Sequence, residues 1–150
     1  MPEAIQISVA RESDRPWCAQ QMANTDPWLT YGFSAETCAR ILQWPGSTLF
    51  VATIRDPVGF LLLHPKGFLG CPYIAVVAVP AVWRSRGIGT QLLRFAEAQF
   101  SGSRHVYLCV SSFNPRALHL YEKCGYLRVG ELSDFIADGH SELLMQKRFT

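Results

Sequence analysis

The sequence predicts an α/β or α+β domain, in which helices cover both faces of a mixed β-sheet. Strand-like and helix-like segments follow one another in the order β-α-α-β-β-β-α-β-α-β-β. In the middle of the chain a buried strand, a helix and a second buried strand are consecutive, which is typical of a parallel crossover. Strand pairs joined by short turns on either side of this unit indicate antiparallel neighbours.

The composition is globular, and we predict one domain over residues 1–150. Hydrophobic residues make up 49% of the chain and charged residues 17%, which excludes disorder. The net charge of +2 is too small for a nucleic-acid-binding surface. No apolar run reaches the ~18 residues of a membrane span, and the beginning of the chain lacks the pattern of a signal peptide. We therefore expect a cytoplasmic protein that binds neither membrane nor nucleic acid.

The cysteines and histidines indicate neither disulfides nor a metal site. The five cysteines form no CxxC pair, and the four histidines lack metal-ligand spacing. Free cysteines within apolar stretches behave as small hydrophobic residues. We therefore expect reduced, buried thiols and no metal.

In the first half of the chain, helix caps and turn residues mark the predicted boundaries. Ser13 or Asp14 lies near the start of one helix, and Ser34 is the expected N-cap of the next, which Pro45 and Gly46 end. The sequence "RDP" (55–57) predicts a tight turn between two strands. The predicted segments are strand 4–9, helix 13–23, an aromatic-rich loop 24–33, helix 34–44, strand 47–54 and strand 58–65.

The second half contains the predicted centre of the sheet. Strand 71–79, "CPYIAVVAV", is apolar on both faces and is therefore expected to be central. Asn114 is the expected N-cap of a helix that has Pro115 in its first turn and Gly125 just past its end. The other predicted segments are a helix beginning at 88, strand 104–110, strand 126–132, turn 137–140 and strand 141–149.

A turn with two glycines, "RSRGIGTQLL", connects the central strand to the helix that follows it. The first turn of a helix has N–H groups without internal partners, and the helix dipole adds positive charge there. Gly87 and Gly89 let an anion approach the backbone, and Arg84 and Arg86 add charge. The turn therefore suits a phosphate group, unless its glycines serve the geometry of the turn alone. The pattern is neither a P-loop nor a dinucleotide fingerprint.

With its flanking strand and helix, this turn resembles the acetyl-CoA signature of the GNAT family of N-acetyltransferases. Arg84, Gly87 and Gly89 match the family pattern, whereas Pro80 stands one position early and Ser85 replaces a frequent glycine. A second stretch, "NPRALHLYEKCGY", is similar to the family's next motif. The element order resembles the family along nearly the whole chain, and the sequence does so over 73–126.

The resemblance implies a fold and a cosubstrate site. The implied fold has a sheet of about six to seven strands, about four helices and central parallel strands that splay apart. The pantetheine of acetyl-CoA would pair with the strand backbone, and its pyrophosphate would bind the amides of the turn. The implied cofactor-binding residues are Val77, Ala78, Val79, Arg84, Ser85, Arg86, Gly87, Ile88, Gly89, Thr90, Asn114, Ala117 and Tyr121.

The implied reaction is direct attack of an amine on the thioester. The N–H of Val79 could stabilise the thioester oxygen, and Tyr121 is the expected catalytic acid that protonates the leaving thiolate. A tyrosine that only packs in the core is the alternative for Tyr121. The base stays open, because the central strand has no acidic residue. Glu36, Asp26 or a chain of water molecules could serve, although a surface or capping role also explains either carboxylate.

The acceptor is expected beside the aromatic-rich loop. Trp28, Tyr31 and Phe33 would form a wall for an apolar or cationic substrate, unless they only pack the loop onto the sheet. Ser111, Ser112 and Phe113 are expected near the same cleft.

Two functions from different classes follow from the resemblance. The first is an acetyl-CoA-dependent N-acetyltransferase that acts on a primary amine of a small molecule or of a peptide or protein N-terminus. The alternative is a non-catalytic acyl-CoA-binding module. The resemblance also suggests a homodimer. The sequence leaves open the acceptor, the base and the preferred acyl length. A nucleotide-binding domain that uses the same turn conflicts with both the motif and the strand order.

Overall fold

The computed structural model of the chain describes residues 4–149. This part contains seven strands, five α-helices and two short 3-10 helices. The strands are β1 (Gln6–Val9), β2 (Thr48–Ile54), β3 (Asp56–Phe68), β4 (Cys71–Ala78), β5 (His105–Ser111), β6 (Leu127–Ser133) and β7 (Ser141–Arg148). The helices are η1 (Glu12–Asp14), α1 (Arg15–Ala23), α2 (Trp28–Tyr31), α3 (Ala35–Ile41), η2 (Ala81–Trp83), α4 (Ile88–Gln99) and α5 (Pro115–Lys123).

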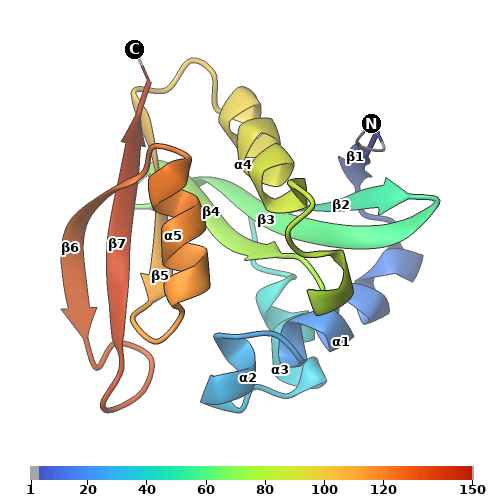
Figure 1. Cartoon of the computed structure of the whole chain (residues 1–150), viewed down its shortest axis with the longest axis horizontal. Coiled ribbons are helices and arrows are strands. Elements are labelled where there is room, and N and C mark those ends of the chain that lie inside the picture. The colour runs from blue at the N-terminus through green and yellow to red at the C-terminus, as the bar shows by residue number, and fades with distance from the viewer. Residues whose placement is uncertain (1–3, 150) are drawn as a thin grey trace.

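The strands form one mixed sheet in the order β1-β2-β3-β4-β5-β7-β6. Only β4 and β5 run parallel among the paired strands of the described chain, and all other neighbours are antiparallel. Helices α4 and α5 pack on one side, and α1 and α3 on the other (Figure 1). The predicted fold class and the central position of β4 are therefore confirmed.

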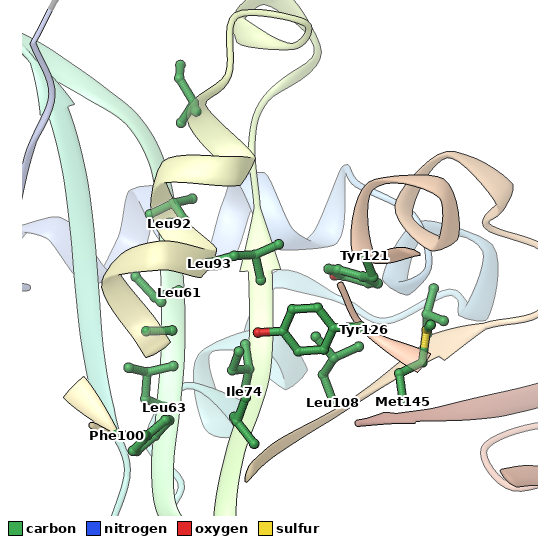
Figure 2. Packing of buried hydrophobic residues seen from close by; sticks show 14 of the residues in the cluster. Leu61, Leu63, Ile74, Leu92, Leu93, Phe100, Leu108, Tyr121, Tyr126 and Met145 are labelled. Carbon is green, nitrogen blue, oxygen red and sulfur yellow. The ribbon is translucent and has the colours of Figure 1, made fainter. Parts of the chain in front are cut away.

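Each face of the sheet has its own hydrophobic core. Phe60 and Leu62 of β3 pack in the cluster beneath α1 and α3. Leu61 and Leu63 point the other way and pack in the cluster with α4, part of which Figure 2 shows. Since successive residues of a strand point to opposite faces, a strand with helices on both sides needs an unbroken apolar run.

The two parallel strands separate soon after they meet. β4 and β5 are paired only at Tyr73 with Tyr107 and at Ile74 with Leu108. In the neighbouring pair, Leu63 faces Ile74 whereas Leu62 faces Val76, so Ala75 is an extra residue in β4. A bulge of this kind bends a strand and increases its twist. The bulge therefore accounts for the predicted splay, and it leaves the β5-facing edge of β4 unpaired after Ile74.

Three predicted boundaries were wrong. The loop 24–33 contains the short helix α2, which Gly32 ends with a φ of +75°. Arg55 alone connects β2 to β3, with a φ of +66°, because Asp56 and Pro57 already pair with β2. Helix α3 ends at Ile41, before the predicted stop.

The extent of the domain and membrane crossing are two further expectations from the sequence. The predicted domain, 1–150, extends past the described residues at both ends and stays a prediction. Within residues 4–149 no helix combines the length and the apolar character that a membrane crossing requires.

Cys18 and Tyr126 are core residues whose pKa values are strongly shifted. Burial raises the pKa of the Cys18 thiol to about 12. Burial also raises the pKa of Tyr126, whose hydroxyl donates a hydrogen bond of 2.9 Å to the Glu97 carboxylate. In an unfolded chain the pKa is about 8.5 for a cysteine thiol and about 10 for a tyrosine hydroxyl.

We expect the free energy of unfolding to fall as the pH rises above about 8.5. Above that pH the folded chain still holds the Cys18 proton that the unfolded chain has lost. This one group should therefore cost about 1.4 kcal/mol of stability per pH unit. Urea unfolding between about pH 7 and about pH 10 measures the slope. Cys18→Ala should have a slope shallower by that amount, and equal slopes for the two proteins would contradict the assignment.

Candidate functional site

The glycine turn leads from the end of β4 into α4. Gly87 is the N-cap of α4. Its φ is +80°, a value that residues with a side chain rarely adopt. The first intrahelical bond joins the Gln91 N–H to the Gly87 carbonyl. The amides of Ile88, Gly89 and Thr90 precede it and have no acceptor within the helix. The turn therefore presents free N–H donors and the positive end of the helix dipole, the combination that binds phosphate.

Two residues of the turn have local reasons for their identity. Ser85 has a φ of +63°, in the left-handed region where a residue with a side chain costs about 1–2 kcal/mol. The glycine that is frequent at this position of the family would avoid that cost. A Cβ on Gly89 would lie 2.9 Å from Leu120 Cδ2, so this glycine lets α4 and α5 approach. Gly89 thus also has a packing role between two helices, which is distinct from the turn geometry considered from the sequence.

A cavity of about 590 Å³ opens in front of the turn, where β4 and β5 separate. Its wall includes the unpaired end of β4, the end of β5, the first turn of α4 and residues along the whole of α5. Most of the predicted cofactor residues line it, namely Val77, Ala78, Val79, Arg84, Ser85, Gly87, Ile88, Gly89, Thr90, Asn114, Ala117 and Tyr121. Arg86, Tyr31 and Phe33 are not among the lining residues.

The two arginines of the turn differ in position. The Arg84 Nε donates a hydrogen bond of 3.0 Å to the Val79 carbonyl and so ties the turn to the end of β4. Burial and the nearby guanidinium of Arg116 lower the pKa of Arg84. Arg86 lies outside the cavity wall, with its guanidinium 4.8 Å from the centre of the Trp83 ring.

Helix α5 brings Asn114, Ala117 and Tyr121 to the same wall. The Asn114 side-chain oxygen accepts a hydrogen bond from the Ala117 N–H, so the predicted N-cap is confirmed. Its side-chain amide makes no hydrogen bond within the described chain. Asn114 can therefore cap the helix and donate into the cavity at once.

Tyr121 is a buried phenol at the cavity wall. Its side chain is 8% exposed, and its ring packs edge-on against Tyr126 at 6.2 Å (Figure 2). Burial raises its pKa, so the hydroxyl stays protonated at neutral pH. Among residues 4–149 the hydroxyl has no hydrogen-bond partner. The group can therefore donate a hydrogen bond into the cavity.

Glu142, the second residue of β7, is a functional candidate that was not predicted from the sequence. Its side chain is 5% exposed and lines the cavity. The Tyr31 hydroxyl donates to its Oε2 at 2.6 Å, and the Ser111 hydroxyl donates to the same oxygen. The only sequence signal was an acidic residue directly before the apolar run "LLM" of β7.

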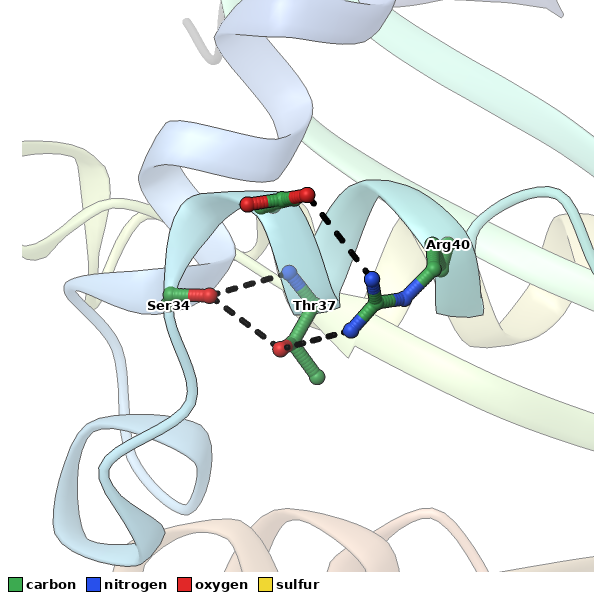
Figure 3. A network of polar contacts seen from close by, with 4 residues as sticks. Ser34, Thr37 and Arg40 are labelled. Carbon is green, nitrogen blue, oxygen red and sulfur yellow. Dashed lines mark hydrogen bonds and ion pairs between the residues drawn. The ribbon is translucent and has the colours of Figure 1, made fainter.

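The two predicted base candidates differ in their surroundings. Glu36 is a surface residue outside the cavity wall, with a side chain 84% exposed and 3.8 Å from Arg40. Figure 3 shows the network that it joins, in which Ser34 caps α3 at the Thr37 amide. Asp26 does line the cavity, and its Oδ1 accepts hydrogen bonds from the Thr30 amide and hydroxyl. Glu36 therefore has the surface role given as its alternative, whereas Asp26 both caps a turn and borders the cavity.

The predicted aromatic wall is divided. Trp28 lines the cavity. Tyr31 lies behind the wall, stacked on Phe33 at 5.8 Å and edge-on to Phe113 at 5.2 Å. Phe33 therefore packs within the loop against Tyr31. Tyr31 is linked to the cavity through its hydroxyl, which donates a hydrogen bond to the lining residue Glu142.

Several further residues line the cavity, most of them charged or polar, that were not predicted from the sequence. Arg116, His119 and Lys123 of α5 border the cavity, as do Tyr73, Cys109 and Ile136. Together with Arg84, the cations make the part beside α5 positive. A positively charged region of this kind is suited to bind phosphate groups.

Comparison with known proteins gives a consistent result. The model of the acetyltransferase (GNAT) family matches residues 13–126. The acetyltransferase Atu2258 of Agrobacterium fabrum is 31% identical over 102 residues, 65% of this chain and 72% of the relative. Arabidopsis thaliana NAA60, solved with a bisubstrate analogue, has a TM-score of 0.82 at 19% identity, over 98% of this chain and 100% of that one. An aminoglycoside 6'-N-acetyltransferase complexed with coenzyme A has a TM-score of 0.76 at 20% identity, covering 95% and 96%.

Proposed function

Because the chain belongs to the GNAT acetyltransferase family, we propose that it transfers the acetyl group of acetyl-CoA to the nitrogen of a primary amine. The amine belongs to a small molecule or to a peptide or protein N-terminus. One observation carries the proposal: the unpaired edge of β4, the free amides of the glycine turn and Tyr121 border a single cavity. The coenzyme A complex of a structurally similar N-acetyltransferase supports the cosubstrate.

The residues present fit acetyl-CoA. The amides of pantetheine need sheet-like partners, and β4 has unpaired backbone groups beyond the bulge at Ala75. The amides that begin α4 would bind the pyrophosphate, with Arg116 and Lys123 adding positive charge. The side-chain amide of Asn114 would donate a hydrogen bond to the same molecule.

The chemistry is attack of a neutral amine on the thioester carbon, with loss of the thiolate. The Val79 N–H is our candidate donor to the oxygen that gains charge. Tyr121 is our candidate acid, because its protonated hydroxyl borders the cavity without another partner in the described chain. With a raised pKa, it would stabilise the departing sulfur chiefly by donating a hydrogen bond.

A non-catalytic acyl-CoA-binding module is the second candidate. The absence of an acidic residue from β4 favoured it. The buried carboxylate of Glu142 on the cavity wall weighs against it, since a binding module needs no such group. The homodimer and the cytoplasmic location stay predictions.

Calorimetry with acetyl-CoA, with ATP as the control, is the first test. We expect micromolar binding of acetyl-CoA, about −8 kcal/mol, and none of ATP. A thiol-release assay with primary amines then separates the two candidates. Binding with amine-dependent release of CoA supports the enzyme, binding without release supports the module, and no binding contradicts both.

A further inference from the structure

Glu142 is a buried carboxylate without a counter-cation. It is 5% exposed, and no Lys, Arg or His in the described chain forms an ion pair with it. Two hydroxyls, of Tyr31 and Ser111, donate to its Oε2. Hydroxyl donors offset only part of the cost of burying a charge. A cation at the Glu142 carboxylate would offset much of the remainder.

The charge of Glu142 acts on the groups around it. Burial is the main reason why the pKa values of Tyr73 and Cys109 are raised, and Glu142 adds to both shifts. Burial and the hydrogen bond to Glu142 raise the pKa of Tyr31 to about 12. Tyr73, Cys109 and Tyr31 are therefore uncharged at neutral pH, and none of them can neutralise the negative charge of the Glu142 carboxylate.

Tyr73 lies near enough to Glu142 to be affected by its charge, and other apolar and aromatic side chains line the same cavity. Trp28, Tyr73 and Ile136 line the cavity from the α2, β4 and β6–β7 sides. Asp26 is the other acidic residue on the wall, and the ring of His140 lies behind Tyr31 at 5.9 Å. The basic residues of the wall come from the glycine turn and α5. An ammonium group with an apolar substituent fits this part of the cavity.

We propose that Glu142 binds the ammonium group of the acceptor and takes the proton that the amine must lose, and that the acceptor carries an apolar group. The carboxylate gains one proton, which it passes to solvent before the next turnover, and the neutral amine forms the C–N bond as the C–S bond breaks. The proton that nitrogen loses on forming the amide equals in number the one that the thiolate gains. Tyr31 and Ser111 are positioning residues for the carboxylate. The catalytic part of this inference rests on the proposed function, whereas the binding of an ammonium group does not.

Binding of phenethylamine, measured by calorimetry with and without CoA, tests the ammonium site directly. We expect Glu142→Gln to weaken binding at least about tenfold, because a charged hydrogen bond is lost. Glu142→Asp keeps the charge and should retain more affinity than Glu142→Gln. Glu131→Gln, which removes an exposed carboxylate on β6, is the matched control and should bind as the wild type does. Ethanolamine should bind more weakly than phenethylamine, because it lacks the apolar group.

The kinetic arm measures amine-dependent release of CoA. Glu142→Gln should lower kcat/KM for phenethylamine at least about 100-fold, while acetyl-CoA affinity stays unchanged. Equal binding and kcat/KM in the wild type and Glu142→Gln would overturn the inference but leave the proposed function standing. Wild-type protein that binds no phenethylamine would also overturn it. If the wild type binds no acetyl-CoA, the proposed function is refuted and the catalytic part of the inference with it. The ammonium site is then still tested, because amine binding without CoA is measured separately. Thermal unfolding of each variant checks that it is folded.

Discussion

Replacing Tyr121 with phenylalanine should lower kcat about 100- to 1000-fold, in the range that general acid catalysis contributes. The substitution removes only the hydroxyl, and the phenyl ring can still pack against Tyr126. Because the hydroxyl bonds to no other described residue, its removal leaves no buried polar group unpaired. We therefore expect unchanged stability and unchanged affinity for acetyl-CoA, with the loss confined to turnover at saturating substrate.

Tyr107→Phe is the matched control for this experiment. Tyr107 is a half-buried tyrosine of β5 outside the cavity wall, and its hydroxyl accepts a hydrogen bond of 2.7 Å from Gln146. Its replacement should leave kcat within about twofold while costing roughly 1 kcal/mol of stability. Full turnover of Tyr121→Phe at neutral pH would mean that Tyr121 is a core tyrosine and not the acid.

Replacing Gly87 with glutamate should raise the Kd of acetyl-CoA at least about 100-fold, or about 2.7 kcal/mol of binding free energy. A Cβ at this position meets no atom within 4 Å, so the side chain has room. The new carboxylate would stand at the positive end of α4, where we place the pyrophosphate, and would repel it. Calorimetric titration of both proteins measures the difference.

Backbone strain has to be separated from charge in this variant. Gly70, in the turn between β3 and β4, has a φ of +79°, again with no atom within 4 Å of a Cβ, and does not line the cavity. Gly70→Glu should therefore lose about the same 1–2 kcal/mol of stability as Gly87→Glu. It should bind acetyl-CoA as the wild type does. If both variants keep full affinity, the phosphate assignment is wrong.

The two substitutions also distinguish the functions that share this cavity. A binding module would be affected by Gly87→Glu and not by Tyr121→Phe, because it has no turnover to lose. An acetyltransferase would be affected by both, in different parameters. The pair therefore separates cosubstrate binding from chemistry within one wall of the site.

Local signals in the sequence determined much of this protein. The caps at Ser34 and Asn114 depend on side chains that bond to amides three residues away, so they can be read from neighbouring residues. The central position of β4 follows from its apolar residues on both faces. The glycine turn, the parallel crossover and Tyr121 on α5 likewise lie within short, recognisable segments.

Only the tertiary structure decided where β4 and β5 separate and which carboxylate is buried at the cavity wall. The bulge at Ala75 is a relation between two strands, and "YIAVVAV" has no residue that marks it. Glu142 and Tyr31 are 111 residues apart, and the pairing of β7 with β5 places Glu142 opposite Ser111. The sequence analysis looked for a base on the central strand and near the second helix, where short-range patterns could be read. Burial of a charge depends on chain segments that meet only after folding, and so it could not be read from any one of them.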